Sequence, residues 1–312
     1  MADEIIRGSD DIVLPFQIES SGARGRLVRL GPALTDILSK HDYPEPVSKL
    51  LGEAMTLTSM LGAALKFDGK FILQTNSDGP VSFLVAHYHA PGNIRGYASF
   101  DDAAFAEGTE TPKLLGGGHL AMTIDQGPEM DRYQGVVPLE GGNLSEAADL
   151  YFRQSEQLPT FIRIAVARHY EGGRADQPGG WSWRAGGLMV QRLTEEGGTA
   201  HTNGHDADDA WTRAHLLAAT VEDHELLDPM LEPERLLYRL FHEERVRAFD
   251  ATKISAFCQC SRGKVENMLA SFSTEDIVDM AADGRVKVTC EFCNTEYDLD
   301  VNDVLRIGAT MQ

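Results

Sequence analysis

The distribution of cysteines constrains the fold of this chain more than any other feature. All four cysteines lie near the C-terminus, as Cys258-Gln259-Cys260 and Cys290-Glu291-Phe292-Cys293, and none precedes Cys258. Zinc prefers a tetrahedral set of soft ligands, and two closely spaced pairs supply four sulfurs to one ion when folding brings them together. The sequence therefore predicts a site for one zinc ion, with Cys258, Cys260, Cys290 and Cys293 as its ligands.

The segments around the two pairs are typical of a small folded module. Helical and alternating patterns surround the cysteines, at residues 263–272, 273–282, 285–289 and 297–301. A module of residues 251–312 buries little apolar surface, and domains of this size commonly rely on a metal for stability. A structural zinc site contributes about 10–16 kcal/mol in small peptides. We therefore expect zinc binding and folding of this module to be coupled.

Three interpretations of the cysteines remain open from the residues themselves. The N-terminus has acidic residues where a secretory signal has basic ones, so we expect a cytoplasmic protein, in which static disulfides are disfavoured. A structural zinc site and a zinc site that also senses oxidants both fit. The Cys-x-Cys spacing favours the sensor. Two cysteines one residue apart in an extended chain have a Cα separation near the upper end of the range that a disulfide permits, about 4.4–6.8 Å, so this pair can form a local disulfide once zinc is lost. Zinc-bound sulfurs are also thiolates, which peroxide attacks, and Lys253, Arg262 and Lys264 add positive charge around the first pair.

The overall charge and hydropathy exclude two classes of partner. The formal net charge is -20, from 28 Lys and Arg against 48 Asp and Glu, so the chain offers no basic surface to a phosphate backbone. The most apolar long stretch, residues 47–65, is interrupted by Lys49, Gly52 and Glu53 and falls short of a membrane span. We expect neither nucleic acid nor a membrane as a partner.

The first part of the chain is typical of an α+β core domain. Helices are expected from Pro46 to about Phe67 and from Asn143 to about Glu156, the second opened by a capping box of Asn143 and Glu146. Strands outnumber helices and cluster in hairpins, and they are expected at 13–18, 24–30, 71–75, 81–87, 95–100, 113–125, 133–139, 160–167 and 188–193. The Gly/Trp-rich segment 172–187 is interpreted as a loop or hairpin tip. This pattern predicts a mixed sheet-and-helix core over residues 1–205.

A helical connector is expected between this core and the cysteine module. Residues 194–209 are polar and rich in glycine and aspartate, and helical periods follow at 211–219 and 234–249. The second helix mixes leucines with charged residues, which fits either an amphipathic helix docked on the core or a connector that can detach. The predicted division is therefore a core of residues 1–205, a helical linker of 206–250 and a zinc-binding domain of 251–312.

The motifs of common enzyme classes are missing from the sequence. We find no Gly-x-Ser-x-Gly elbow, no phosphate loop ending in Gly-Lys-Ser/Thr, no His-Glu-x-x-His and no Gly-x-Gly-x-x-Gly. Cys-x-x-Cys in a thiol oxidoreductase is expected at the start of a helix, whereas here it lies between strands. We therefore expect a protein that is not an enzyme; an α+β partner-binding protein with a purely structural zinc module is the alternative to a redox-controlled one.

The cysteine motifs resemble the C-terminal signature of the heat-shock protein 33 family. The residues concerned are Phe257-Cys258-Gln259-Cys260-Ser261-Arg262 and Val288-Thr289-Cys290-Glu291-Phe292-Cys293-Asn294. The resemblance extends over nearly the whole chain, through Leu50-Leu51-Gly52-Glu53, Leu65-Lys66-Phe67-Asp68-Gly69, Ser77-Asp78-Gly79-Pro80, Arg95-Gly96, Arg132-Tyr133-Gln134-Gly135-Val136-Val137 and the run from Tyr151 to Thr160.

This resemblance implies a redox-regulated cytoplasmic holdase chaperone. It implies that the four cysteines hold zinc in a reduced, inactive state, and that oxidation pairs Cys258 with Cys260 and Cys290 with Cys293 while zinc leaves. The zinc domain and the linker then unfold and expose apolar surface that holds unfolding client proteins. It also implies a homodimer in the active state.

Overall fold

The computed structural model describes residues 10–65, 68–105, 113–127, 130–140, 143–173, 179–192 and 204–311. The chain divides into two compact units, Met1–Ala256 and Phe257–Gln312. The helices of the expected linker thus belong to the first unit. The division into functional parts at residues 205 and 250 stays a prediction.

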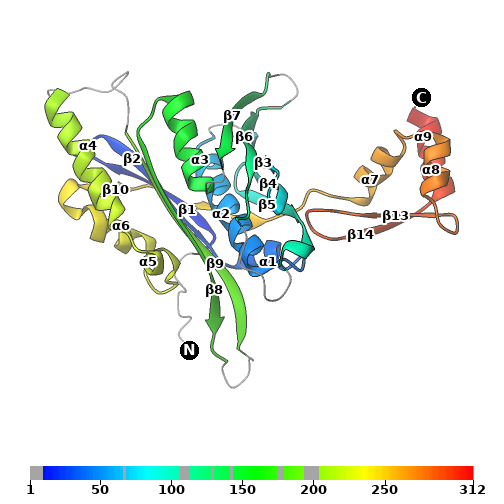
Figure 1. Cartoon of the computed structure of the whole chain (residues 1–312), viewed down its shortest axis with the longest axis horizontal. Coiled ribbons are helices and arrows are strands. Elements are labelled where there is room, and N and C mark those ends of the chain that lie inside the picture. Colours follow the sequence, from blue (N-terminus) through cyan, green and yellow to red (C-terminus); the bar gives the residue numbers. More distant parts are fainter. Residues whose placement is uncertain are drawn as a thin grey trace. The chain divides into compact units, whose positions relative to one another are not determined.

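The first unit contains two sheets that are antiparallel in almost every pairing (Figure 1). One has the order β10-β1-β2-β9-β8, with β11 also paired to β1; its strands are β1 (Ile12–Ile18), β2 (Ala23–Leu30), β8 (Thr160–Glu171), β9 (Gly180–Gln191), β10 (Val246–Ala248) and β11 (Thr252–Lys253). The other has the order β12-β5-β4-β3-β6-β7; its strands are β3 (Lys70–Ser77), β4 (Val81–His89), β5 (Asn93–Phe100), β6 (Gly117–Asp125), β7 (Tyr133–Glu140) and β12 (Ser255–Ala256). We call them the first and the second sheet; β12 is parallel to β5.

Helix α2 (Glu45–Gly62) packs between the two sheets (Figure 1). Its sequence is apolar around most of its circumference, and a helix of that kind must be buried. The main core therefore joins side chains of α2 such as Met55 to Val28 of the first sheet and Leu73 of the second. Helices α1 (Pro32–Leu38) and α3 (Leu144–Tyr151) complete this core, and a π-helical turn (Phe152–Glu156) follows α3.

Three helices cover the opposite face of the first sheet. They are α4 (Gly204–Ala219), α5 (Asp223–Leu227) and α6 (Pro233–Phe241), followed by a 3-10 turn (His242–Glu244). Apolar side chains repeat along α6 at Leu236, Leu237, Leu240 and Phe241, and all four are buried in a second core against the sheet. The amphipathic helix expected here is docked in the structure.

The second unit is a small α+β module. It contains α7 (Arg262–Leu269), α8 (Thr274–Met280), the hairpin of β13 (Arg285–Thr289) and β14 (Glu296–Asp300), and α9 (Val301–Met311). Its core consists of buried Val265, Leu269, Ile277, Val286, Leu299, Val301 and Val304. A core this small supplies little stability of its own.

The α+β class and most elements expected from the sequence are confirmed, including the capping box at Asn143. Several expected bounds are wrong, among them the start of the helix expected at residue 211, which begins at Gly204. Residues 180–187 belong to strand β9, because they pair along their length with β2 and β8; residues 174–178 lie outside the described part. The helix expected over 234–249 ends at Phe241, and Val246–Ala248 pairs with β1. The strand expected over 297–301 ends at Asp300, where α9 begins. Among the described residues, no helix is long and apolar enough to cross a membrane.

Candidate metal centre and the surface covered by the connector

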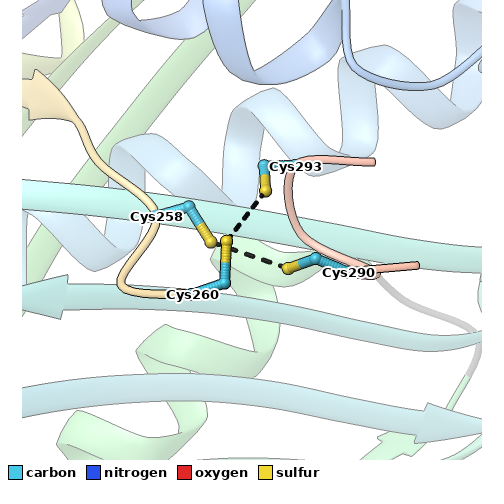
Figure 2. A group of neighbouring side chains, drawn as sticks. All are labelled: Cys258, Cys260, Cys290 and Cys293. Carbon is cyan, nitrogen blue, oxygen red and sulfur yellow. Dashed lines mark hydrogen bonds between the residues drawn. The ribbon is translucent and has the colours of Figure 1, made fainter. Parts of the chain in front are cut away.

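The four cysteines converge on one point of the second unit (Figure 2). Cys258 and Cys260 lie in the loop before α7, Cys290 follows β13, and Cys293 lies in the turn before β14. All four sulfurs lie within 4.8 Å of one another. The Sγ atoms of Cys258 and Cys290 are 3.7 Å apart, and those of Cys260 and Cys293 are 3.3 Å apart. The sequence-predicted ligands are therefore brought together.

The turn between β13 and β14 positions the second pair of cysteines. The amide of Cys290 donates to the carbonyl of Thr295 at 2.9 Å, and the amide of Asn294 donates to the carbonyl of Cys290 at 2.8 Å. Asn294 has a φ of 55°, a left-handed conformation that asparagine tolerates better than most residues. This closed turn holds Cys290 and Cys293 on one side of the hairpin end.

The first pair is held by the start of α7. Ser261 caps this helix, since its hydroxyl accepts a hydrogen bond from the amide of Lys264. Lys264 also donates from Nζ to the carbonyl of Gln259 at 2.7 Å, which fixes the residue between the two cysteines. The charge of Arg262 is paired with Glu266 at 2.8 Å, and Lys253 belongs to the first unit. Of the three cations expected near the first pair, Lys264 is therefore the one in the second unit whose charged group contacts the loop between Cys258 and Cys260.

The donor set fits a metal ion of the zinc type. Zinc–sulfur bonds of about 2.3 Å in a tetrahedron place the sulfurs about 3.8 Å apart. The sulfur separations of 3.7 and 3.3 Å are near that value, and all four ligand atoms are soft sulfurs from free cysteines. All four sulfurs lie within 4.8 Å of one another, so both sequence pairs can reach a single shared ion.

Burial and hydrogen bonding make Cys260 and Cys293 acids of different strength. Burial raises the pKa of Cys260 to about 12, against the hydrogen bond that the Tyr297 hydroxyl donates to its sulfur at 3.1 Å. Burial also acts to raise the pKa of Cys293, but hydrogen bonding by Thr295, whose hydroxyl lies 3.2 Å from Sγ, and by the neighbouring thiols lowers it to about 6. Sequence reasoning missed Thr295 and Tyr297, because only the closed hairpin brings their hydroxyls to the sulfurs.

A broad apolar surface lies under the helices α4 to α6. The first sheet contributes Leu14, Phe16, Ile18, Leu27, Leu188 and Val190, all buried. The rings of Phe16 and Phe241 stack at a centroid distance of 5.7 Å. At the edge of this contact Arg213 of α4 pairs with the largely buried Glu244 at 2.9 Å, and Glu244 also hydrogen-bonds Ser20. The helices thus cover a cluster of apolar side chains of the first sheet.

Comparison with known proteins shows the family to which the chain belongs. The family model described as "Hsp33 protein" matches residues 11–300. The "33 kDa chaperonin" of Caulobacter vibrioides strain NA1000 is 46% identical over 298 residues, 93% of this chain and 95% of the relative. That of Pseudomonas syringae pv. tomato is 37% identical over 301 residues, 96% of this chain and 94% of the relative. The crystal structure of the 33 kDa chaperonin of Thermotoga maritima has the same fold, with a TM-score of 0.76 at 20% identity, over 96% of this chain and 99% of that one. The chain therefore belongs to the Hsp33 family, a family of chaperones and not of enzymes.

Proposed function

We propose that this protein is a redox-regulated holdase that binds unfolding proteins under oxidative stress in the cytoplasm. The observation that carries the proposal is the four-sulfur cluster, which joins both ends of the segment that forms α7, α8 and β13. The second unit has a core of seven buried residues, and the fold of so small a unit depends on a link of this kind. Loss of the cluster therefore removes the main support of its fold.

Cys258, Cys260, Cys290 and Cys293 would hold one zinc ion in the reduced protein. When bound, zinc supplies a stable tetrahedral link between four thiolates. We propose that oxidation pairs Cys258 with Cys260 and Cys290 with Cys293. Each pairing joins two thiolates, and the two electrons pass to one hydrogen peroxide, which takes up two protons and leaves as two waters. A disulfide sulfur is no longer a thiolate, so the donor set is lost and the metal is released.

The proposed consequence is exposure of the surface under the helices. Residues 251–312 unfold, and the linker of residues 206–250, which is continuous with them, then leaves the first sheet. The apolar side chains around Phe16 and Leu188 become available to exposed apolar segments of client proteins. Family membership supports this client class, and we further propose that the active form is a homodimer.

The decisive experiment follows client aggregation and metal release together. A thermally unfolding client is mixed with the reduced protein and with the same protein after hydrogen peroxide treatment, while released zinc is measured with a colorimetric chelator. We expect one zinc per chain to be released on oxidation, and suppression of aggregation to appear in parallel. Equal suppression by the reduced, metal-loaded protein would instead support a partner-binding protein with a purely structural zinc module.

Peptide mapping of the oxidised protein tests the pairing separately. Cleavage between the two sequence pairs and mass spectrometry without reduction should find each pair closed within its own peptide. A bond between Cys258 and Cys293 as the main product would contradict the proposed pairing.

A further inference from the structure

Two buried arginines of the first sheet bind main-chain carbonyls of the connector. Arg29 of β2 donates from Nη1 to the carbonyl of Asp228 at 2.5 Å and from Nη2 to the carbonyl of Glu225 at 2.9 Å. Arg184 of β9 donates from Nε to the carbonyl of Leu227 at 2.8 Å. These carbonyls lie at the end of α5, where a helix leaves its last carbonyls without partners inside the helix.

Both arginines lie among apolar side chains on the face of the sheet that the connector covers. Arg29 is 2% exposed and Arg184 is 6% exposed, and the neighbouring positions on this face include Leu27 and Leu188. The carboxylate of Asp10 pairs with Arg184 through both oxygens. Within the described part of the chain, the hydrogen bonds of Arg29 end on carbonyls alone, and its buried Nε has no partner there.

Arg29 remains a cation in this setting. Burial, with the nearby charge of Arg184, lowers the pKa of Arg29 to about 10, which still leaves it protonated at neutral pH. A buried guanidinium that lacks acceptors is strongly disfavoured. When the connector leaves, its donors must therefore find water or new acceptors of the same kind.

We propose that Arg29 and Arg184 form a carbonyl-binding site that the connector occupies in the inactive protein and the main chain of an unfolded client occupies in the active one. The proposal rests on the proposed function, since it requires the connector to leave. An unfolded chain exposes both apolar side chains and unpaired carbonyls, and this surface offers a partner for each. Because carbonyls are common to all residues, the site recognises clients independently of their sequence.

A substitution at Gly186 separates the two proposed roles of the arginines, which are to hold the end of α5 and to bind the main chain of a client. A Cβ at this position of β9 would lie 2.3 Å from the carbonyl oxygen of Leu226, so Gly186→Ala pushes α5 off the sheet while it leaves both arginines in place. Arg29→Met removes the donors and keeps an unbranched apolar side chain, although a shorter one. Arg24→Met is the matched control, since Arg24 is exposed and lies on the opposite face of the same strand.

Two measurements are made on each variant. Hydrogen exchange of residues 223–241 is measured in the reduced, metal-loaded protein, and the Kd for carboxymethylated α-lactalbumin, which is permanently unfolded, is measured after full oxidation. We expect exchange to be at least tenfold faster in Arg29→Met and in Gly186→Ala. We expect a Kd at least fivefold weaker in Arg29→Met only, and no change of either quantity in Arg24→Met.

A wild-type Kd in Arg29→Met would overturn the proposal and leave the arginine as a helix cap. Arg29→Lys keeps the charge but loses the planar pair of donors, so it provides a second test, with an expected weakening of at least threefold, if the methionine variant does not fold. Failure of the oxidised wild-type protein to bind the client would instead overturn the proposed function.

A peptide separates main-chain carbonyls from carboxylates as the ligand. The peptide carries the sequence of residues 223–241, with every aspartate and glutamate replaced by the corresponding amide. We expect it to bind the oxidised wild-type protein and to bind Arg29→Met at least fivefold more weakly. If only the acidic peptide depends on Arg29, the site binds carboxylates and the proposal is wrong.

Discussion

The sulfur of Cys260 has two close contacts in the candidate metal centre. It lies 3.3 Å from the sulfur of Cys293 and accepts a hydrogen bond from the hydroxyl of Tyr297. We expect Cys260→Ser to lose most of its bound zinc and to unfold part of the second unit, because a hydroxyl does not replace a thiolate ligand. Metal content and circular dichroism of the reduced protein check this. Tyr297→Phe is the control, for which we expect bound zinc at about tenfold lower affinity; wild-type metal content in Cys260→Ser would contradict the assignment.

Glu53 introduces a pH dependence into the stability of the first unit. Burial against the apolar lining of a pocket formed with Leu50 and Leu115 raises the pKa of Glu53 to about 7, from an ordinary value of 4.5. Since the pKa of Glu53 is higher in the folded state than in the unfolded state, the free energy of unfolding falls as the pH rises from about 4.5. The loss is complete above about pH 7. It amounts to at most about 3 kcal/mol.

We therefore expect Glu53→Gln to match the wild type at pH 4 and to be more stable at pH 8. Denaturant unfolding followed by tryptophan fluorescence measures this in the first unit, because all three tryptophans, Trp181, Trp183 and Trp211, lie there. Glu45→Gln, at the exposed start of the same helix and paired with Lys49, should not show this gain. An equal change at both pH values would rule out ionisation as the cause.

Helix α6 is the element whose docking we expect to hold the protein inactive. Leu240 is 2% exposed on its inner face, whereas Tyr238 is 65% exposed on its outer face. Leu240→Asp buries an unpaired charge against the sheet, so the helix should detach without oxidation. We expect the reduced, metal-loaded variant to suppress client aggregation and to bind a hydrophobic dye several times more than wild type. Tyr238→Asp should behave like wild type, and an inactive Leu240→Asp protein that retains its metal would show that α6 does not block the site.

At the scale of elements, the hairpins and long helices could be predicted because their signal is local. The alternation of β3 and β4 and the capping box of α3 are examples. The strands between residues 246 and 256 could not, because they are two or three residues long and exist only by pairing with β1 and β5. The metal site could likewise be predicted, because the spacing of the four cysteines is a local signal. The role of Arg29 could not, because the carbonyls that it binds lie 196 and 199 residues away in the chain.

The molecule as a whole has two units with separate cores, and only the second contains the cysteine cluster. We expect removal of metal from the reduced protein by a chelator to abolish amide protection in residues 262–305 while β2, β3 and β6 stay protected. Hydrogen exchange measured by mass spectrometry resolves the two regions. Zinc should restore protection and magnesium should not, because magnesium prefers oxygen ligands. Continued protection of the second unit after metal removal would refute the coupling of metal binding and folding.

The short strands β10, β11 and β12 close one edge of each sheet, since the first two pair with β1 and the third pairs with β5. If residues 246–256 leave with the connector, β1 and β5 become open edges with unpaired amides and carbonyls. Such edges accept an extended segment as an additional strand. Client capture by the oxidised protein should then increase intermolecular β-structure, visible in the amide I infrared band, and prolines placed in the client should reduce it.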